Sequence, residues 1–395
     1  MIRSMMGAAL GAFGAMLGVA HTADAQLTIR LTSVPPATPA GAVHVAGSFN
    51  RWSPGDARYT LVAQPDGSYA ITLPDSVRGA VEFKLTLGSW DAVETSASGG
   101  AVENRRAIVP ATGPATYVGS VAAWQSATSS AAPKPSTASR SVRVLSDSFA
   151  MPQLGRARRV WLYLPRDYAT SGKRYPVLYM HDGQNVFDAA TSFAGEWGVD
   201  ETLDSIETHG GRGAIVVAVD NGGDHRMDEY DPWKNADPKL GGGEGDAYVS
   251  FLVRTLKPYI DAHYRTLRDA RHTAVIGSSM GGLISLYAAL ERPDVFGRAG
   301  VFSCACWVAG PRILALARHT KPGPSPARFY FVSGAFETKE GQPANDQRLV
   351  VDSLVASGFR RGTAVRSVIV PDGKHAEWFW RREFPAAYAW LMAER

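Results

Sequence analysis

Apolar and polar positions follow two different patterns along this chain of 395 residues. Between residues 27 and 118, short segments alternate apolar and polar side chains and end at turns such as Pro35-Pro36 and Asp66-Gly67, which predicts half-buried β-strands. After residue 175, continuous apolar runs such as Ile215–Val219 alternate with helical stretches, which predicts a parallel sheet covered on both faces. The pattern therefore predicts an all-β domain followed by an α/β domain.

The boundaries of these domains follow from changes in composition. We predict that residues 27–118 form an immunoglobulin-like β-sandwich, because about ninety residues carry short strands and regular turns. Residues 119–141 are rich in Ser, Ala and Pro without an apolar period, which indicates a flexible linker. Residues 142–395 form the predicted α/β domain, which begins with antiparallel strands.

The first 25 residues have the pattern of a secretory signal peptide. Arg3 supplies a positive charge, an uncharged stretch of small and apolar residues follows, and Ala23-Asp24-Ala25 fits a cleavage site. No cysteine lies in this region, so we expect no lipid anchor at the cleavage site. No later run is long and apolar enough to span a bilayer. We therefore expect a secreted or periplasmic protein without a membrane anchor.

Composition narrows the function further. The net charge of +4 is small for this length and the basic residues are scattered, so we expect no nucleic-acid partner. The two cysteines, Cys304 and Cys306, lie two positions apart. Export permits a disulfide, but a bridge between such close residues strains the required geometry. We therefore expect either two reduced cysteines or a strained, labile pair, and no zinc site.

A glycine-flanked serine stands between a predicted strand and a predicted helix. The run Thr273–Ile276 leads into Gly277-Ser278-Ser279-Met280-Gly281, and apolar residues at helical spacing follow. Small residues on both sides of the serine allow a strained strand-to-helix turn that exposes the hydroxyl. We therefore predict Ser279 as a nucleophile, with the backbone N–H of Met280 facing a developing oxyanion. The competing interpretation is a glycine-rich turn ahead of a core helix.

A serine nucleophile needs a base and an acid that orients the base. His375 follows the last predicted strand, in a turn from which an imidazole can reach the serine. Glu337 follows the preceding strand and is the predicted acid, with Asp346 as the alternative. The acid holds the histidine tautomer and stabilises the imidazolium.

The second oxyanion donor is expected in the loop from His181 to Asp188. Gly183 allows a sharp turn there, so the backbone N–H of Gln184 can face Ser279. His181 and Asp182 lack a third ligand at helical spacing, so we expect no metal and no organic cofactor. Further polar and aromatic residues after the predicted strands suggest a substrate wall, with loop packing as the alternative. These candidates are Arg226, Tyr230, Trp233, Trp307 and Trp378.

Three motifs in order resemble the putative esterase family of α/β-hydrolases. They are Tyr179-Met180-His181-Asp182-Gly183-Gln184-Asn185-Val186-Phe187-Asp188, Gly277-Ser278-Ser279-Met280-Gly281-Gly282 and Gly373-Lys374-His375-Ala376-Glu377-Trp378. The resemblance covers residues 143–391 and implies an α/β-hydrolase fold. It also implies a triad of Ser279, Glu337 and His375 and an oxyanion hole from Gln184 and Met280. The family includes feruloyl and acetyl-xylan esterases, S-formylglutathione hydrolase, enterochelin esterases and secreted mycolyltransferases. Many relatives have aspartate where this chain offers Glu337.

The N-terminal segment resembles the glycogen-binding family of carbohydrate-binding modules. The matching residues are Gly47-Ser48-Phe49-Asn50-Arg51-Trp52, Phe83-Lys84, Gly88-Ser89-Trp90 and Glu103-Asn104-Arg105. By this resemblance the sugar contacts are Trp52, Lys84, Trp90 and Asn104. Aromatic faces suit the apolar face of a sugar, and lysine and asparagine can bind its hydroxyls. The alternative is that both tryptophans are hinge or core residues of an accessory domain.

These observations together predict a secreted serine ester hydrolase that acts on acyl esters of carbohydrates, such as feruloyl or acetyl esters. The partners expected are a small-molecule or polysaccharide ester and a glycan bound by the N-terminal domain. A siderophore esterase that cleaves a cyclic trilactone is the alternative enzyme, since enterochelin esterases also pair a β-sandwich with this fold. A glycan-binding protein with a vestigial hydrolase domain is the alternative of another class. Hydrolysis and acyl transfer are not separated by the sequence.

Overall fold

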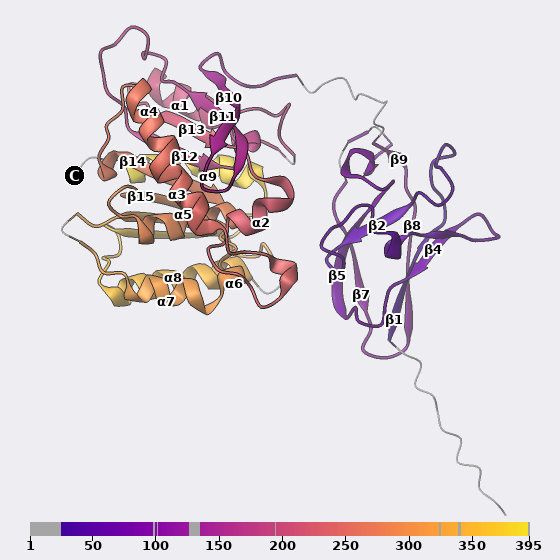
Figure 1. The fold of residues 1–395 in the computed structure, drawn as a ribbon. Coiled ribbons are helices and arrows are strands. Elements are labelled where there is room, and N and C mark those ends of the chain that lie inside the picture. Colours follow the sequence, from indigo (N-terminus) through magenta and orange to yellow (C-terminus); the bar gives the residue numbers. More distant parts are fainter. Residues whose placement is uncertain are drawn as a thin grey trace, which may run out of the picture. The chain divides into compact units, whose positions relative to one another are not determined.

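The computed structural model describes residues 25–97, 99–100, 102–125, 135–193, 195–323, 325–338 and 341–393 (Figure 1). The chain divides into two compact units, residues 1–132 and residues 133–395, which are described separately. The predicted signal peptide lies outside the described residues except for Ala25. Within the described part of the chain, no helix is long and apolar enough to cross a membrane.

The first unit consists of short β-strands. One sheet has the order β3-β4-β1-β8, a second has the order β2-β5-β7, and β6 pairs with β9. A single apolar core receives Leu27 and Ile29 from the first sheet and Phe83 and Leu85 from the second. The strands are β1 (Gln26–Leu31), β2 (His44–Gly47), β3 (Val62–Ala63), β4 (Tyr69–Thr72), β5 (Gly79–Thr86), β6 (Glu94–Thr95), β7 (Arg105–Val109), β8 (Pro114–Gly119) and β9 (Ala123–Trp124). Two sheets therefore share one core, while the immunoglobulin-like topology stays a prediction.

Both ends of the predicted linker are fixed to their own unit. The indole Nε1 of Trp124 donates to Thr38 Oγ1 at 2.7 Å within the first unit. On the far side, Ser136 Oγ donates to Asp188 Oδ2 at 2.8 Å and the Ser139 N–H donates to Asp200 Oδ2 at 2.7 Å. Residues near both ends of the linker predicted for residues 119–141 therefore bond within their own units, while the bounds of the linker stay a prediction.

The second unit is built on an eight-stranded sheet with the order β10-β11-β13-β12-β14-β15-β16-β17. β10 and β11 pair antiparallel, β11 pairs antiparallel with β13, and all later pairs are parallel. The strands are β10 (Val142–Met151), β11 (Arg156–Tyr163), β12 (Val177–His181), β13 (Ile215–Val219), β14 (Thr273–Ser278), β15 (Arg298–Phe302), β16 (Arg328–Gly334) and β17 (Val365–Val370). The apolar runs in the sequence therefore mark the parallel strands.

Helices cover both faces of this sheet (Figure 1). Val177, Tyr179 and Val217 point into a core shared with helices α3 to α8, whereas Leu178 and Val216 point into a core shared with α1 and α9. The helices are α1 (Val199–Thr208), α2 (Arg226–Glu229), α3 (Gly245–Phe251), α4 (Lys257–His263), α5 (Met280–Glu291), α6 (Cys306–Ala309), α7 (Pro311–His319), α8 (Gln342–Ser357) and α9 (Glu377–Met392). Because successive strand residues face opposite sides, one apolar strand supplies both cores.

The carboxyl ends of the parallel strands all reach the same edge of the sheet. His181 ends β12, Ser279 follows β14, Glu337 follows β16 and His375 follows β17. Side chains that are almost two hundred positions apart in the sequence are thereby gathered at one edge, where ligands of open α/β sheets bind.

Candidate active site

Ser279 occupies a strained turn between β14 and α5. Its backbone has φ 57° and ψ −120°, a conformation that non-glycine residues rarely adopt. The N–H of Ser279 donates to the carbonyl of Phe302 at 2.9 Å, and its carbonyl accepts the N–H of Ala305 at 3.0 Å. The two partners lie at the end of β15 and in the segment after it, so neighbouring backbone holds the serine in this conformation.

The glycines around Ser279 are required by close backbone contacts. A Cβ on Gly277 would lie 2.7 Å from the backbone carbon and oxygen of Gly281. A Cβ on Gly282 would lie 3.0 Å from the carbonyl oxygen of Phe302. The spacing of the motif therefore lets the strand, the turn and the first turn of α5 pass at contact distance.

His375 and Glu337 are joined by a hydrogen bond. His375 Nδ1 lies 2.8 Å from Glu337 Oε2, and the Glu337 side chain is fully buried. Glu337 Oε1 accepts from Ser303 Oγ at 2.7 Å and from the Gly334 N–H at 2.6 Å. Trp380 Nε1 in turn donates to Ser303 Oγ at 2.8 Å. The carboxylate is thus fixed by two donors while its second oxygen orients the imidazole.

Asp346, the alternative acid, lies in a different environment. It belongs to α8 and accepts the backbone N–H of Trp307, and its Oδ2 has no hydrogen-bond partner in the described part of the chain. Partial burial raises the pKa of this carboxyl. The structure therefore brings Glu337, and not Asp346, to His375.

The predicted oxyanion loop turns at Asp182, not at Gly183. Asp182 has φ 55°, and residues Gly183–Asn185 form a short 3₁₀ turn, η3. A Cβ on Gly183 would lie 2.8 Å from the backbone carbon of Val219, so this glycine permits close packing on β13. The backbone N–H groups of Gln184 and Met280 donate to no acceptor among the described residues, which leaves both available to an oxyanion.

Arg226 fixes the oxyanion loop through Asp182. Its Nε and Nη2 lie 2.7 and 2.8 Å from the two carboxylate oxygens, and Asn221 Nδ2 adds a bond of 2.8 Å. Burial alone would raise the pKa of Asp182, but the Arg226 charge and these bonds hold the pKa below its usual value. Arg226, predicted as substrate wall, therefore serves first as a clamp on the loop.

Tyr230, also predicted as part of the substrate wall, lies in the interior. Its side chain is fully buried, and its hydroxyl accepts the backbone N–H of Asp182 at 3.2 Å. It therefore lies beneath the oxyanion loop and not on a substrate-facing surface. Its polar sequence neighbours suggested exposure, and only the tertiary packing of its ring against His181 and Tyr248 places it inside.

His181 lies in the interior behind the nucleophile turn. Its Nδ1 is 2.9 Å from Tyr248 Oη, and its Nε2 has no partner among the described residues. Burial lowers the pKa of His181 to about 4, so the imidazole is neutral at physiological pH. A Cβ on Gly277 would lie 2.9 Å from His181 Cδ2, so this ring supports the nucleophile turn by packing.

The predicted aromatic wall is partly exposed. The side chains of Trp307 and Trp378 are 46% and 49% exposed, whereas Trp233 is half-buried with its ring 5.4 Å from that of Tyr287. Sequence reasoning missed two more exposed rings, Phe193 and Phe336. Phe336 directly precedes Glu337, and this position next to the predicted acid is the feature of the sequence that could have identified it.

Glu377 is a further residue whose role the motif did not reveal. It is buried at the start of α9, and Asn185 Nδ2 donates to its Oε1 at the long distance of 3.5 Å. Burial raises the pKa of Glu377, and the Asp182 charge adds to this effect. The bond joins the segment after His375 to the oxyanion loop.

Cys304 and Cys306 form a disulfide with an S–S distance of 2.00 Å. We expected either two reduced cysteines or a strained, labile pair, and the expectation of two reduced cysteines is therefore wrong. Both cysteines are buried, and they enclose Ala305, whose N–H donates to the Ser279 carbonyl. The bridge thus lies in the segment that connects the nucleophile turn with Ser303 and Glu337.

The predicted sugar contacts lie on β5 and in the loops beside it. The ring centroids of Trp52 and Trp90 are 6.4 Å apart with an interplanar angle of 35°, and both side chains are partly exposed. Lys84 Nζ donates to the Val102 carbonyl, and Asn104 Nδ2 donates to Glu82 Oε2 at 3.3 Å. The two tryptophans are therefore neighbours at the surface, while the polar pair is engaged within the unit.

The strand order, the helices on both faces and the serine turn at the sheet edge define an enzyme of the α/β-hydrolase type. Residues 151–391 match the family described as "Putative esterase". The chain therefore belongs to this family and is a carboxylic ester hydrolase.

Relatives and solved structures extend this result. The chain is 28% identical over 246 residues to "Uncharacterized protein YbbA" of Bacillus subtilis, which spans 60% of the chain and 93% of that protein. It is 26% identical over 243 residues to an "Endo-1,4-beta-xylanase/feruloyl esterase" of Xylanibacter ruminicola, spanning 60% of the chain and 29% of that protein. A match of 46% over 94 residues to an "Alpha-amylase" of Niallia circulans spans 24% of the chain and 7% of that protein.

Among solved structures, the enterobactin esterase FES from Shigella flexneri aligns with a TM-score of 0.51 and 17% identity. The alignment covers 88% of the chain and 87% of that structure. At this identity the likeness establishes a shared fold.

Proposed function

We propose that this chain is an exported serine esterase in which Ser279 is the nucleophile, His375 the base and Glu337 the acid. The observation that carries the proposal is the buried Glu337 bonded to His375 Nδ1 at 2.8 Å, at the same sheet edge as the strained Ser279 turn. A bonded acid fixes the tautomer that leaves Nε2 free to accept a proton. Export rests on the sequence pattern of residues 1–25.

The chemistry follows from these positions. His375 takes the proton of Ser279 as the hydroxyl oxygen attacks the ester carbonyl, and Glu337 stabilises the imidazolium that forms. The N–H groups of Gln184 and Met280 bind the oxyanion of the tetrahedral intermediate. His375 then protonates the leaving alkoxide, and a water molecule activated by the same imidazole releases the acyl group.

We propose acyl esters of carbohydrates, of the feruloyl or acetyl type, as the substrates. Similarity to a xylanase/feruloyl esterase supports the ester class, and similarity to an α-amylase supports a carbohydrate context. Exposed Trp307 and Trp378 offer flat apolar faces that suit an aromatic acyl group or a sugar ring.

We also propose that the first unit binds a glycan through Trp52 and Trp90. The two neighbouring rings form an apolar surface of the kind that stacks on the C–H face of a sugar. Lys84 and Asn104 already bind partners within the unit, so they contribute to sugar binding only after exchanging those bonds.

A siderophore esterase is the second candidate. The observation that favours it is the alignment with an enterobactin esterase. This alignment covers 88% of the chain, a larger share than residues 133–395 alone, so it extends into the first unit. A cyclic trilactone has the same reacting group as the carbohydrate esters, so the catalytic residues and their roles are unchanged.

Turnover of p-nitrophenyl acetate and butyrate tests the nucleophile. We expect the wild-type protein to release p-nitrophenol and Ser279→Ala to lose this activity by several orders of magnitude. Ser278→Ala is the matched control, because Ser278 ends β14 and should leave turnover intact. Equal activity in wild type and Ser279→Ala would overturn the proposal.

A substrate panel then separates the two candidates. Methyl ferulate and acetylated xylan report the carbohydrate-ester activity, and a catecholate trilactone reports the siderophore activity. The preferred substrate is the one with the highest kcat/KM, because that ratio measures transition-state binding relative to free enzyme and substrate.

A further inference from the structure

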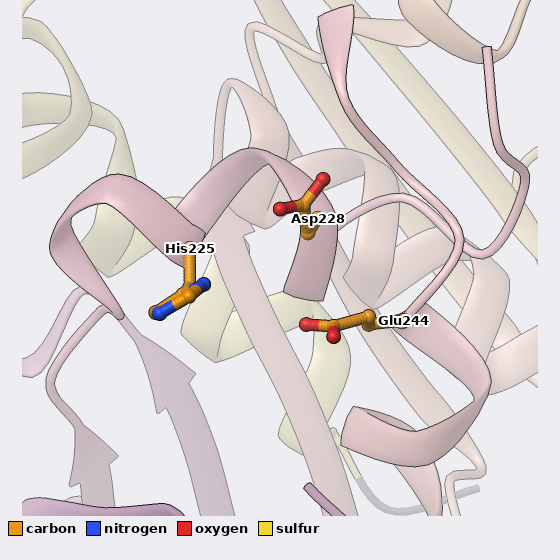
Figure 2. Close-up of side chains that lie close together, drawn as sticks. All are labelled: His225, Asp228 and Glu244. Atoms are coloured by element: carbon orange, nitrogen blue, oxygen red, sulfur yellow. The ribbon is translucent and has the colours of Figure 1, made fainter. Parts of the chain in front are cut away.

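A cluster of potential metal ligands lies beside α2, apart from the residues that carry out ester hydrolysis. Each of three residues offers one ligand atom, and these three atoms lie within 4.8 Å of one another; the residues are His225, Asp228 and Glu244. Figure 2 shows these side chains where α2 begins and where the segment before α3 passes it. His225 ends the 3₁₀ turn η4 (Gly223–His225), Asp228 lies one helical turn later and Glu244 precedes α3.

The surrounding charges leave an excess of negative charge at this cluster. Arg156 and Arg158 both bond to Glu229 Oε1, and Arg156 also bonds to both oxygens of Glu244. With Asp228, three carboxylates therefore face two guanidinium groups. Asp228 Oδ1 accepts the Gly242 N–H at 2.9 Å, which orients the carboxylate without neutralising it.

A buried oxygen next to the cluster is also unsatisfied. Glu229 is fully buried, and its Oε2 has no hydrogen-bond partner among the described residues. A Cβ on Gly222 would lie 2.8 Å from this oxygen and 3.0 Å from the Cβ of His225, so both border the same glycine. A buried carboxylate oxygen without a donor favours a cation nearby.

We propose that His225, Asp228 and Glu244 form a divalent-cation site. One imidazole nitrogen and two carboxylate oxygens are ligands that suit Zn²⁺, with water completing the coordination. Arg156 then acts as the outer partner that orients Glu244, as hydrogen-bonding groups around metal-bound carboxylates do.

The site has a structural consequence for the catalytic unit. Arg226, which holds Asp182 of the oxyanion loop, lies directly after His225 and two residues before Asp228. The Glu244 N–H donates to the Asp228 carbonyl at 3.0 Å, so the two segments already touch. A bound cation links them through side chains as well and stabilises the segment that carries the clamp.

Calorimetric titration of the full chain with ZnCl₂ tests the site, using untagged protein first treated with a chelator. We expect one saturable site in wild type and in the control Asp224→Asn, which changes a carboxylate of the same turn outside the cluster. His225→Ala and Asp228→Asn should each weaken binding about tenfold or more. Thermal unfolding provides a second readout: zinc should raise the Tm of wild type and of the control, but not of the cluster variants.

The proposal is overturned if folded wild type shows no saturable zinc binding, or if both cluster variants bind as tightly as wild type. Circular dichroism of each zinc-free variant verifies folding, and His225→Gln replaces His225→Ala if the latter does not fold. CaCl₂ is the second probe, since calcium takes oxygen ligands. Calcium binding that does not depend on His225, without any zinc binding, also contradicts an imidazole-containing site.

Discussion

At the scale of single residues, the site depends on groups held in conformations that are unfavourable in isolation. Ser279 has a positive φ of 57°, and Glu337 carries a carboxylate in a fully buried position. Backbone bonds to Phe302 and Ala305 hold the serine, and donors from Ser303 and Gly334 hold the glutamate. In the proposed mechanism, the reacting groups are therefore positioned before any substrate binds, which would reduce reorganisation in the transition state.

The acid can be assigned by a pair of substitutions. Glu337→Gln should lower kcat/KM for p-nitrophenyl butyrate on the order of 10²- to 10⁴-fold, because His375 loses the charge that stabilises its protonated form. Asp346→Asn should leave kcat/KM unchanged, since Asp346 lies on α8 and bonds to Trp307. Steady-state kinetics of both folded variants measure the difference, and the reverse ranking would assign Asp346 as the acid.

His181 should make stability depend on pH. Burial lowers its pKa to about 4, with the Asp182 charge opposing and the Arg226 charge adding to this effect. The unfolded chain, with a histidine pKa near 6.5, therefore binds more protons between about pH 6.5 and pH 4. The contribution of the neutral imidazole is complete above pH 6.5 and is lost as pH falls toward 4, by on the order of 3 kcal/mol.

Urea unfolding of wild type and His181→Asn from pH 8 to pH 4 tests this prediction. The difference in unfolding free energy between wild type and His181→Asn should shrink as the pH falls. The comparison of the two proteins is needed because Asp200 also makes stability depend on pH. Burial raises the pKa of Asp200 to about 7, so its ionisation reduces stability as pH rises, which is opposite to the effect of His181. A difference that stays constant over this range would contradict a neutral buried His181.

At the scale of elements, the short segment after β15 connects the Ser279 turn with Glu337. The Ala305 N–H bonds to Ser279, Ser303 Oγ bonds to Glu337, and the Cys304–Cys306 disulfide encloses Ala305. The bridge closes a loop of very few residues, so its entropic contribution to global stability is small. Its main effect should therefore be on local geometry.

The double variant Cys304→Ser/Cys306→Ser tests that role. We expect kcat for p-nitrophenyl butyrate to fall roughly 10- to 100-fold, because displacement of Ser303 and Ala305 disturbs both Ser279 and Glu337. Thermal unfolding should change much less than kcat does. An unchanged kcat would show that the backbone of this segment is fixed without the bridge.

The elements that sequence could predict are those specified by local pattern. The apolar run at residues 215–219 coincides with β13, because a buried parallel strand needs uninterrupted apolar residues. β17 at residues 365–370 ends the sheet and is only partly buried, so it tolerates Arg366 and Ser367. The segment from Tyr248 to Ile260 is helical, in line with the helical stretches predicted after residue 175, but its turn at Leu252–Leu256 is a π-helix that the pattern did not indicate. Pro258 follows this turn, and the N–H that it lacks helps to explain the interruption.

In the candidate site, too, the sequence predicted what local pattern and chain order specify, and not what depends on tertiary packing. The chain order of Ser279, Glu337 and His375 pointed to residues that the fold brings to one edge, because strand ends determine their place. The burial of Tyr230 and the clamp by Arg226 depend on how α2 packs, which no local pattern reveals. The state of Cys304 and Cys306 stayed open between a reduced pair and a bridge, because their spacing alone does not give the backbone geometry that the disulfide needs.

At the scale of the whole molecule, two compact units carry separate tasks in this account. The first unit has its own core and the tryptophan pair, and the second has the sheet and the ester site. Trp52→Ala and Trp90→Ala should therefore abolish retention of the protein on insoluble polysaccharide and leave hydrolysis of p-nitrophenyl butyrate unchanged.

Affinity electrophoresis in gels containing glycogen or xylan measures retention for each variant. Ser279→Ala is the control, because it should lose hydrolysis and keep retention. Retention of both tryptophan variants at the wild-type level would remove the first unit's proposed role. If retention depends on the tryptophans while every ester remains uncleaved, the alternative of a glycan-binding protein with a vestigial hydrolase domain gains support.

The central claim is that Ser279 is an activated nucleophile, and covalent labelling with a fluorophosphonate tests it most directly. The reagent needs an activated serine but no particular acyl group or alcohol, so its result does not depend on the natural substrate. The account predicts a single adduct on the peptide that contains Ser279, which is absent in Ser279→Ala and strongly slowed in a His375 variant. A folded wild-type protein that remains unlabelled, or an adduct on another serine, would contradict it.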